Sequence, residues 1–354
     1  MVKENESDGP FWDPVNMTSH YDKVHFPSVH WAGWYDIFMD HQINAFNGYY
    51  KKGQAAYRGD TYLFVEPHGH CYDVVYYRGI SLLGLKLGRK IFQLANTGVR
   101  DPLLDSVKNI NLFIMGPQGG GILNPGNYYT SVDEWPVYTP TSYFLSSDKT
   151  LQTIAPLANS SLSYRYDPDT PAATFGGNNL FGTCGGLDQS SLETRSDYLV
   201  FTTASLVRDT AIVGPISAVL YVSSSANDTD FIVKVTDVYP DGQSILIQEG
   251  SIRMRWLGDK RAPAVAIVPG RVYEVTVEIW RTAFIFARGH SIRVSITSSN
   301  EPRYDANPNN GQPLVNRGES ILAENTIFMG KAQPSRLVLP VVDQSQIPPA
   351  SFNF

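Results

Sequence analysis

Residues with the chemistry of a hydrolytic site lie in two short stretches of this 354-residue chain. His68 and His70 stand one residue apart in VEPHGHCYD, directly after the apolar run Tyr62 to Val65, and Asp36 lies in GWYDIF. An imidazole beside a carboxylate can act first as a general base and then as a general acid. Two histidines at this spacing can also bind a metal ion. The same residues are therefore compatible with acid–base catalysis and with metal binding.

The positions of Asp36 and His70 along the chain favour proton transfer. Each follows a run that predicts a strand, and the working side chains of open α/β sheets lie at the carboxyl ends of strands. An acid after one strand and a histidine after the next is the end of the Ser, Asp, His order of α/β-hydrolases. In such a triad the carboxylate orients the imidazole, which takes the serine proton and gives it to the leaving group. The competing interpretations are a loop histidine without a role and a helix N-cap for Asp36.

A metal site is the alternative for the histidine pair. His68 and His70 would be two ligands, with Asp73 or Asp36 completing the set, because a catalytic zinc site needs three protein ligands. The remaining histidines form no second pair of this kind. We therefore expect no metal and no organic cofactor. Cys71 follows His70, but adjacent side chains in a loop normally point apart, which disfavours a nucleophilic role for this cysteine.

Residues 1–103 predict alternating strands and helices. Lys23 to Trp31 and Thr61 to Glu66 have the composition of strands. Apolar residues after the first strand recur at intervals of four, three and four, the spacing of one face of a helix that ends near Gly53. A second helix is predicted for Ile80 to Ala95. Strand, helix, strand, helix is the pattern of a parallel α/β sheet.

Residues 104–354 have a different pattern, with β-branched or alternating runs separated by turns rich in Pro, Gly, Asn and Asp. We predict strands at Pro215 to Ser224, Phe231 to Val238, Val272 to Ile279 and Ser291 to Thr297. Many strands joined by such turns are typical of an antiparallel sandwich, most simply a jelly roll. The expected fold class is thus α/β plus all-β: the C-terminal part of an α/β-hydrolase domain (1–103), followed by a jelly-roll β-sandwich (104–354).

The α/β part is expected to be incomplete. Two parallel strands with two helices cannot cover both faces of a sheet or satisfy its edges. The chain has no Gly-x-Ser-x-Gly nucleophile elbow. The nearest approaches are Ser81, inside a helical pattern, and Ser291, inside a strand pattern. We therefore expect no nucleophile in this chain, and a serine supplied by an N-terminal α/β-hydrolase chain or a missing segment.

Charge and composition exclude other classes of protein. The net charge is −6 and no Lys or Arg run marks a nucleic-acid surface. No apolar run approaches the length of a membrane span. Cys71 and Cys184 are too few for a disulfide framework, and their spacing does not show whether they pair. Four glycosylation sequons leave a secreted, lysosomal or cytoplasmic location open. These sequons begin at Asn5, Asn16, Asn159 and Asn227.

Several long motifs resemble the C-terminal portion of the cocaine esterase and X-Pro dipeptidyl-peptidase hydrolases, the CocE/NonD family. FPSVHWAGWYDIF (Phe26 to Phe38) resembles the family's motif around the catalytic aspartate, and EPHGHC (Glu66 to Cys71) its motif around the catalytic histidine. Motifs that resemble the family's jelly-roll domain follow in the same order: INLFIMG, YRYDPDTPAATFGG, RSDYLVFTT, DTDFIVKVTDVYPDG and GHSIRVSITSSNEPRYDANPNNG. The resemblance covers nearly the whole chain.

The resemblance implies roles for individual residues. Asp36 occupies the position of the catalytic acid and His70 that of the catalytic base. Phe38 looks like a residue that lines the acyl pocket in relatives, although ordinary helix packing explains it equally well. Trp34 and His68 are the other candidates for substrate contact, and His68 stands where the family usually has an aromatic residue.

We therefore expect a serine hydrolase that acts on ester or amide bonds of an acyl or Xaa-Pro peptide substrate. Its substrate would be a small molecule or a peptide, and homo-oligomerisation stays open. One alternative is a metal-dependent hydrolase. The other is a non-catalytic jelly-roll module that binds carbohydrate or protein, served by the clusters at Asp228 to Asp230 and Asn307 to Gly311. Turn chemistry explains those clusters more simply.

Overall fold

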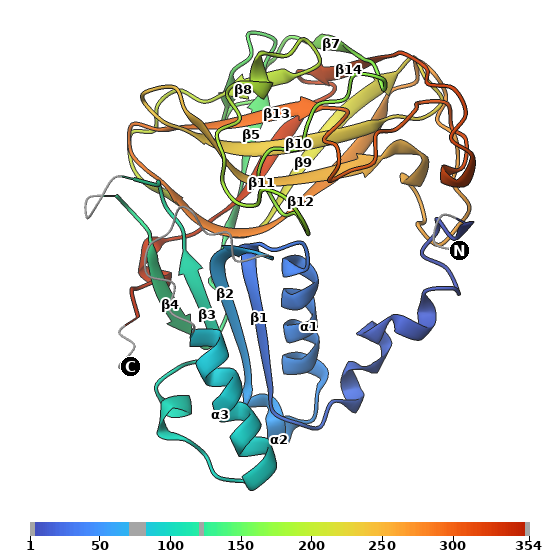
Figure 1. Ribbon diagram of the computed structural model, residues 1–354. Coiled ribbons are helices and arrows are strands. Elements are labelled where there is room, and N and C mark those ends of the chain that lie inside the picture. Colours follow the sequence, from blue (N-terminus) through green and yellow to red (C-terminus); the bar gives the residue numbers. More distant parts are fainter. Residues whose placement is uncertain (1–3, 71–82, 120–123, 351–354) are drawn as a thin grey trace.

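The computed structural model describes residues 4–70, 83–119 and 124–350 and consists of an α/β part and a β-sandwich stacked on it (Figure 1). The carboxyl ends of the strands β1 (Ser28–Tyr35) and β2 (Thr61–Gly69) face the sandwich. No helix among the described residues has the length and apolar character needed to cross a membrane.

The α/β part is built on a four-stranded sheet of order β1-β2-β3-β4. β3 (Ile110–Ile114) pairs with β2 in parallel, and β4 (Tyr128–Val132) pairs with β3 antiparallel. The four-stranded sheet therefore continues past residue 103, through β4, while the domain boundary at that residue stays a prediction. A short apolar strand such as β3 carries no local signal of which sheet it will join.

Helices cover both faces of the β1–β2 pair. α1 (Met39–Lys52) packs against the face of β2 that carries Leu63 and Val65, and α3 (Leu83–Thr97) against the face that carries Phe64. Alternate residues of a strand point to opposite faces, so β2 is apolar on both sides, as expected of a parallel strand. Residues 80–82 of the second predicted helix lie outside the described residues. A single short turn, α2 (Ala55–Arg58), precedes β2.

The sandwich consists of two antiparallel sheets, a smaller one of order β11-β10-β13-β8 and a larger one of order β6-β5-β15-β9-β14-β7, in which β12 also pairs with β9. The smaller sheet contains β8 (Leu199–Thr202), β10 (Asp230–Val238), β11 (Ser244–Arg253) and β13 (Ser291–Thr297). The larger contains β5 (Thr139–Leu145), β6 (Leu151–Gln152), β7 (Ser160–Tyr166), β9 (Thr210–Ser224), β12 (Tyr273–Phe286), β14 (Ala323–Met329) and β15 (Arg336–Val341). The predicted strands lie within these ranges except that Val272 precedes β12 by one residue, while the jelly-roll topology stays a prediction.

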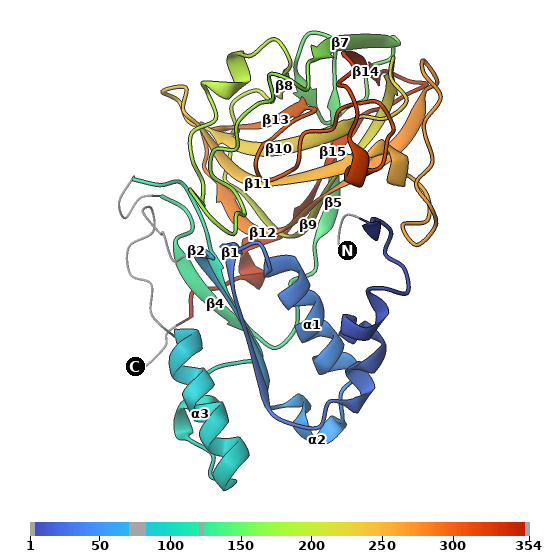
Figure 2. The ribbon, with the colours of Figure 1, turned by 45° about the vertical axis from the view of Figure 1, so that its right-hand side comes forward.

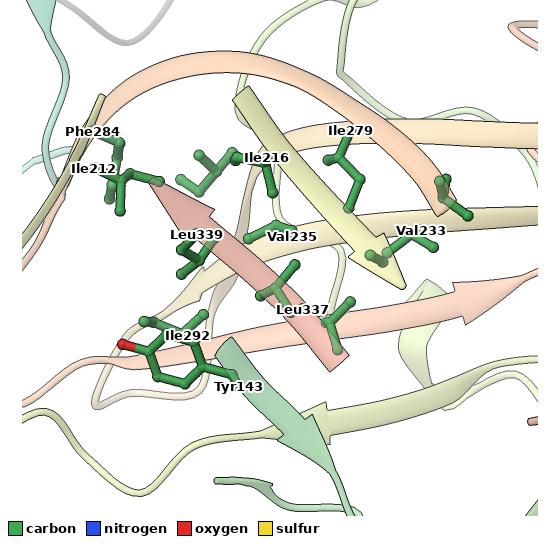
Figure 3. Packing of buried hydrophobic residues seen from close by; sticks show 14 of the residues in the cluster. Tyr143, Ile212, Ile216, Val233, Val235, Ile279, Phe284, Ile292, Leu337 and Leu339 are labelled. Carbon is green, nitrogen blue, oxygen red and sulfur yellow. The ribbon is translucent and has the colours of Figure 1, made fainter. Parts of the chain in front are cut away.

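Side chains from both sheets meet in the core of the sandwich (Figure 3). Val235 of β10 and Ile292 of β13 come from the smaller sheet, and Ile216 of β9 and Leu337 of β15 come from the larger; all four are at most 1% exposed. Burying one such side chain stabilises the fold by about 1.5–3 kcal/mol. This packed core anchors the loops of the sandwich that contact the α/β part.

The N-terminal segment runs beside α1 and up to the sandwich (Figure 2). It contains short 3-10 helices, among them Met17–Lys23, whose Tyr21 packs directly on α1 at Gly48. Nearer the sandwich, the guanidinium of Arg261 binds both carboxylate oxygens of Asp13 at 3.0 Å. The segment thereby contacts both parts of the molecule.

Candidate active site

Asp36 and His70 lie side by side at the carboxyl ends of β1 and β2. Nδ1 of His70 is 3.2 Å from Oδ2 and 3.3 Å from Oδ1 of Asp36. An ionised carboxylate only accepts hydrogen bonds, so Nδ1 carries the proton and Nε2 is left as an acceptor. The His70 side chain is 39% exposed and that of Asp36 13%. An oriented, accessible imidazole with an acceptor nitrogen has what a general base needs.

The turn between β1 and α1 orients the Asp36 carboxylate. The backbone N–H of Asp36 donates to the carbonyl oxygen of Gly33 at 3.0 Å, and the N–H of Phe38 donates to Asp36 Oδ1 at 2.8 Å. α1 begins at Met39 with Phe38 as its N-cap residue, so Asp36 caps the preceding turn and is not the helix N-cap that the sequence suggested. The carboxylate can bind this turn and His70 at the same time.

Glycine allows the two strand ends to approach closely. A Cβ on Gly33 would lie 1.9 Å from the carbonyl oxygen of His68, and a Cβ on Gly69 would lie 2.4 Å from Cβ of Cys184. A side chain at either position would force the neighbouring backbone or side chain to move. Both glycines therefore help to fix the loop that carries His70 relative to Asp36.

Phe38 presents an apolar surface beside the imidazole. Its side chain is 53% exposed, and its ring lies edge-on to His70, with the ring centroids 5.2 Å apart and the planes at 78°. A side chain that packed a helix into the core would be buried. Of the two interpretations of Phe38, the exposed position favours contact with a ligand.

Trp34 and His68, the other two predicted substrate residues, are buried. Trp34 is 1% exposed, and its indole N–H donates to the carbonyl oxygen of Phe113 at 2.7 Å. His68 is 4% exposed, and its Nε2 lies 3.4 Å from Glu66 Oε2. The His68 ring also packs edge-on against Trp31, with centroids 5.8 Å apart. These contacts pack both residues within the strands, and substrate contact by Trp34 and His68 stays a prediction.

The two histidines diverge, which separates the ligands that a metal site would need. His68 lies against Glu66, whereas His70 lies against Asp36. Within residues 4–70, 83–119 and 124–350, no group of three or more His, Cys, Asp or Glu side chains could hold a metal ion. Asp73 and Cys71 lie outside those ranges, while Cys184 is buried.

The two serines closest to a nucleophile motif do not complete the pair in the described structure. Ser81 lies outside the described residues. Ser291 begins β13 of the sandwich and pairs with Val238, so it is not on a strand-to-helix elbow. Over the part of the chain that the structure describes, the acid and the base are therefore present without an elbow serine.

The polar clusters considered for a binding module are paired internally. Asp228 accepts a hydrogen bond from Nε of Arg255 at 2.7 Å, and Asp230 binds Arg253 at 2.8 Å. The amide of Asn307 donates to both aspartates, at 2.9 and 2.7 Å. These contacts account for the cluster as part of the folded sandwich.

A loop of the sandwich makes a contact with the site that the sequence did not reveal. Nδ2 of Asn178 donates to the carbonyl oxygens of Trp34 at 2.9 Å and of Asp36 at 3.1 Å. Asn178 is 142 positions away from Asp36 in the chain. Local patterns carry no information about such a pairing, and an Asn in a Gly-rich stretch predicts only a turn.

Family comparisons identify the class of protein. Residues 107–338 match the model of the X-Pro dipeptidyl-peptidase C-terminal non-catalytic domain, and residues 1–72 match that of the S15 family of X-Pro dipeptidyl-peptidases. The chain therefore belongs to the CocE/NonD and X-Pro dipeptidyl-peptidase family, which confirms the resemblance seen in its motifs.

Individual relatives are longer than this chain. The cocaine esterase of Rhodococcus sp. (strain MB1 Bresler) is 30% identical over 375 residues, which cover 96% of this chain and 61% of the esterase. An aminopeptidase from the marine sediment archaeon Thaumarchaeota archaeon shares the fold with a TM-score of 0.77 at 21% identity, over 96% of this chain and 60% of that chain. An α-amino acid ester hydrolase does so with a TM-score of 0.81 at 19% identity and the same coverage. The chain thus spans about three fifths of the length of each.

Proposed function

We propose that this chain is the C-terminal part of a serine hydrolase that cleaves ester or amide bonds, and that it supplies the acid and the base of a Ser-His-Asp triad. The observation that carries the proposal is the contact of His70 Nδ1 with Asp36 at the ends of adjacent parallel strands. Membership of a hydrolase family supports it. The substrate is proposed to be a small acyl ester or an Xaa-Pro peptide.

The chemistry is acyl transfer to water in two stages. Nε2 of His70 removes the proton of the serine hydroxyl as the serine oxygen attacks the carbonyl carbon. The Asp36 carboxylate stabilises the imidazolium that forms, and His70 then protonates the leaving alcohol or amine. A water molecule repeats the sequence on the acyl-enzyme, with His70 again the base. Phe38 contacts an apolar group of the substrate next to the scissile bond.

The serine is proposed to come from an N-terminal α/β-hydrolase chain or segment. β1 is the last strand of the described sheet, so no described strand pairs with its other edge, and an unpaired edge favours the addition of a strand. The outer side of α3 also exposes apolar side chains, with Leu85 40% and Phe92 72% exposed. A further strand and helix of an α/β domain would cover both. The sandwich, expected to be a jelly roll, would line the side of the active site opposite this N-terminal part.

Active-site labelling of the native assembly tests this proposal. A fluorophosphonate reacts with a serine that a triad activates, and mass spectrometry locates the label. We expect the label on a serine of the N-terminal companion, and its loss in H70A. A label on Ser81 or Ser291 would place the nucleophile in this chain, and no label on any polypeptide would overturn the serine mechanism. Rates on p-nitrophenyl esters and Xaa-Pro p-nitroanilides then separate the ester from the peptide substrates.

A further inference from the structure

We propose that Asn178, in a loop of the β-sandwich, is a positioning residue that sets the Asp36 carboxylate for its contact with His70. The inference rests on the proposed function and adds a role for the domain that the family description calls non-catalytic. It places one side chain of the sandwich in direct control of the turn that carries the acid.

The Asn178 side chain binds the backbone on both sides of Tyr35. Its amide nitrogen donates one hydrogen bond to the carbonyl oxygen of Trp34 and the other to that of Asp36, at 2.9 and 3.1 Å. The side chain is fully buried, so water does not compete for these bonds. The Asp36 N–H is held by the carbonyl oxygen of Gly33. Both peptide groups of Asp36 are therefore fixed, and the direction of its Cα–Cβ bond follows from them.

The loop that carries this amide is anchored in the sandwich. The preceding residue, Gly177, has φ +84 and exchanges two backbone hydrogen bonds with Gly185, at 2.8 and 3.1 Å. A Cβ on Gly177 would lie 2.6 Å from Oε1 of Glu249. That buried carboxylate is bound by Arg303 and by Asn300, each at 2.9 Å. The loop thus lies on a buried network and presents its amide from a fixed position.

Other contacts between the sandwich and the α/β part lie on the flanks of the same turn. The hydroxyl of Tyr35 donates to the carbonyl oxygen of Leu246 at 3.0 Å. Arg281 binds Asp40, in the first turn of α1, at 2.5 Å. Among the described residues of the sandwich, Asn178 is the one that hydrogen-bonds the backbone of Asp36. The flanking contacts dock the two parts, whereas Asn178 acts on the acid.

The neighbouring residue offers a matched control. Asn179 is 8% exposed, and its amide also donates to two carbonyl oxygens, those of Gly176 at 2.9 Å and Thr183 at 2.7 Å. These partners belong to the same loop and not to the α/β part. N178A and N179A therefore remove the same chemistry from the same loop, and only N178A releases the turn of Asp36.

Kinetics of the nucleophile-bearing assembly on a p-nitrophenyl ester test the proposal. A displacement of about 1 Å at a reacting group can cost about 10²-fold in rate, so we expect N178A to lower kcat by about 10- to 100-fold with KM close to wild type. The acid limb of its kcat/KM profile should move to lower pH, because a displaced carboxylate stabilises the imidazolium less. N178Q, which keeps an amide, should recover part of kcat, and N178D, which cannot donate, should not. N179A should keep the wild-type kcat and profile.

A second readout needs no substrate. The Nδ1 proton of His70 gives a low-field NMR signal when it is bonded to a carboxylate, and its loss in D36N identifies it. We expect N178A to shift or broaden this signal and N179A to leave it unchanged. An unchanged signal and pH profile in N178A, or equal losses of kcat in N178A and N179A, would overturn the positioning role. If the wild-type assembly takes no fluorophosphonate, the proposed function fails, and the NMR comparison still decides the role of Asn178.

Discussion

Two aspartate–histidine pairs of similar geometry lie in different surroundings within the described part of the chain. Nδ1 of His70 lies 3.2 Å from Asp36, and Nδ1 of His290 lies 2.9 Å from Asp237. The first pair is at the ends of parallel strands, with the imidazole 39% exposed, whereas the second lies in the sandwich with the imidazole 12% exposed. Contact between the two groups therefore does not define a catalytic site. The first pair differs in two ways: its imidazole is more exposed, and it lies at the carboxyl ends of parallel strands.

Burial gives the second pair a different electrostatic task. Asp237 is fully buried, and burial raises the pKa of its carboxyl, while the hydrogen bond from His290 opposes that rise. The ring of His290 also lies against Tyr239, with ring centroids 4.5 Å apart. An unpaired carboxylate at this position would be costly. The second pair thus compensates a buried charge, and the first offers an accessible base.

The comparison is tested most strongly by the same substitution at the two aspartates. D36N should lower kcat of the assembled hydrolase by about 10⁴-fold, because the amide no longer stabilises the imidazolium or fixes the productive tautomer. D237N should leave kcat/KM within about twofold of the wild-type value, because its histidine does not lie at the carboxyl ends of the parallel strands. Initial rates on a p-nitrophenyl ester measure both. Similar losses in the two variants would show that position does not separate the pairs.

Removing the second histidine should affect stability instead of rate. H290A leaves the carboxyl group of Asp237 buried without its histidine partner, which should lower the free energy of unfolding by about 3–5 kcal/mol. Urea denaturation of wild type and H290A measures the difference. The buried carboxyl has a raised pKa, so its folded form binds a proton more readily than the unfolded form, and the deficit should shrink as the pH falls. A deficit that does not change with pH would contradict this account.

A third histidine, His30, sharpens the comparison because it is buried without a carboxylate. It is 5% exposed and lies edge-on to Phe46 and Tyr49. Burial lowers its pKa from 6.5 to about 4. Between these pH values the unfolded chain binds a proton that the folded chain does not, so acid should destabilise the protein through His30 by up to about 3 kcal/mol.

The measurement is the free energy of unfolding from pH 7 to pH 4. H30L should lose this part of the decrease in the free energy of unfolding at acid pH. H25L, at an exposed position, should show the wild-type dependence of the free energy of unfolding on pH. Equal slopes in wild type and H30L would mean that folding does not change the pKa of His30.

Local patterns predicted β1, β2, α1, α3, four strands of the sandwich and the acid–base pair, but not the ends of the strands. The predicted strands ended at Trp31 and Glu66, whereas β1 and β2 continue to Tyr35 and Gly69. These additional residues place Trp34 and His68 inside the sheet, where both side chains are buried. Strand ends depend on pairing with a neighbour and on the fit of the sandwich above, which a local window does not contain.

For a related reason, the sequence did not predict the contacts between the α/β part and the sandwich. Asn178 reaches Asp36, and Arg281 reaches Asp40, across sequence separations of 142 and 241 residues. The order of the motifs established that a sandwich follows the α/β part. Which side chain meets which carbonyl depends on how the two parts dock, and local sequence patterns do not show that.

The smallest expected effect concerns the aromatic ring beside the exposed pair. Phe38 is 53% exposed next to His70, and Phe26 is 47% exposed on the α/β part, where its ring contacts Tyr49. An aromatic contact contributes about 0.5–1.5 kcal/mol, so F38A should raise KM for an aryl ester by about 2- to 10-fold with kcat little changed. F26A removes an equally exposed ring that does not face the pair and should leave both constants unchanged. A wild-type KM in F38A would assign this ring to packing, and the exposed surface beside His70 would then have no part in binding.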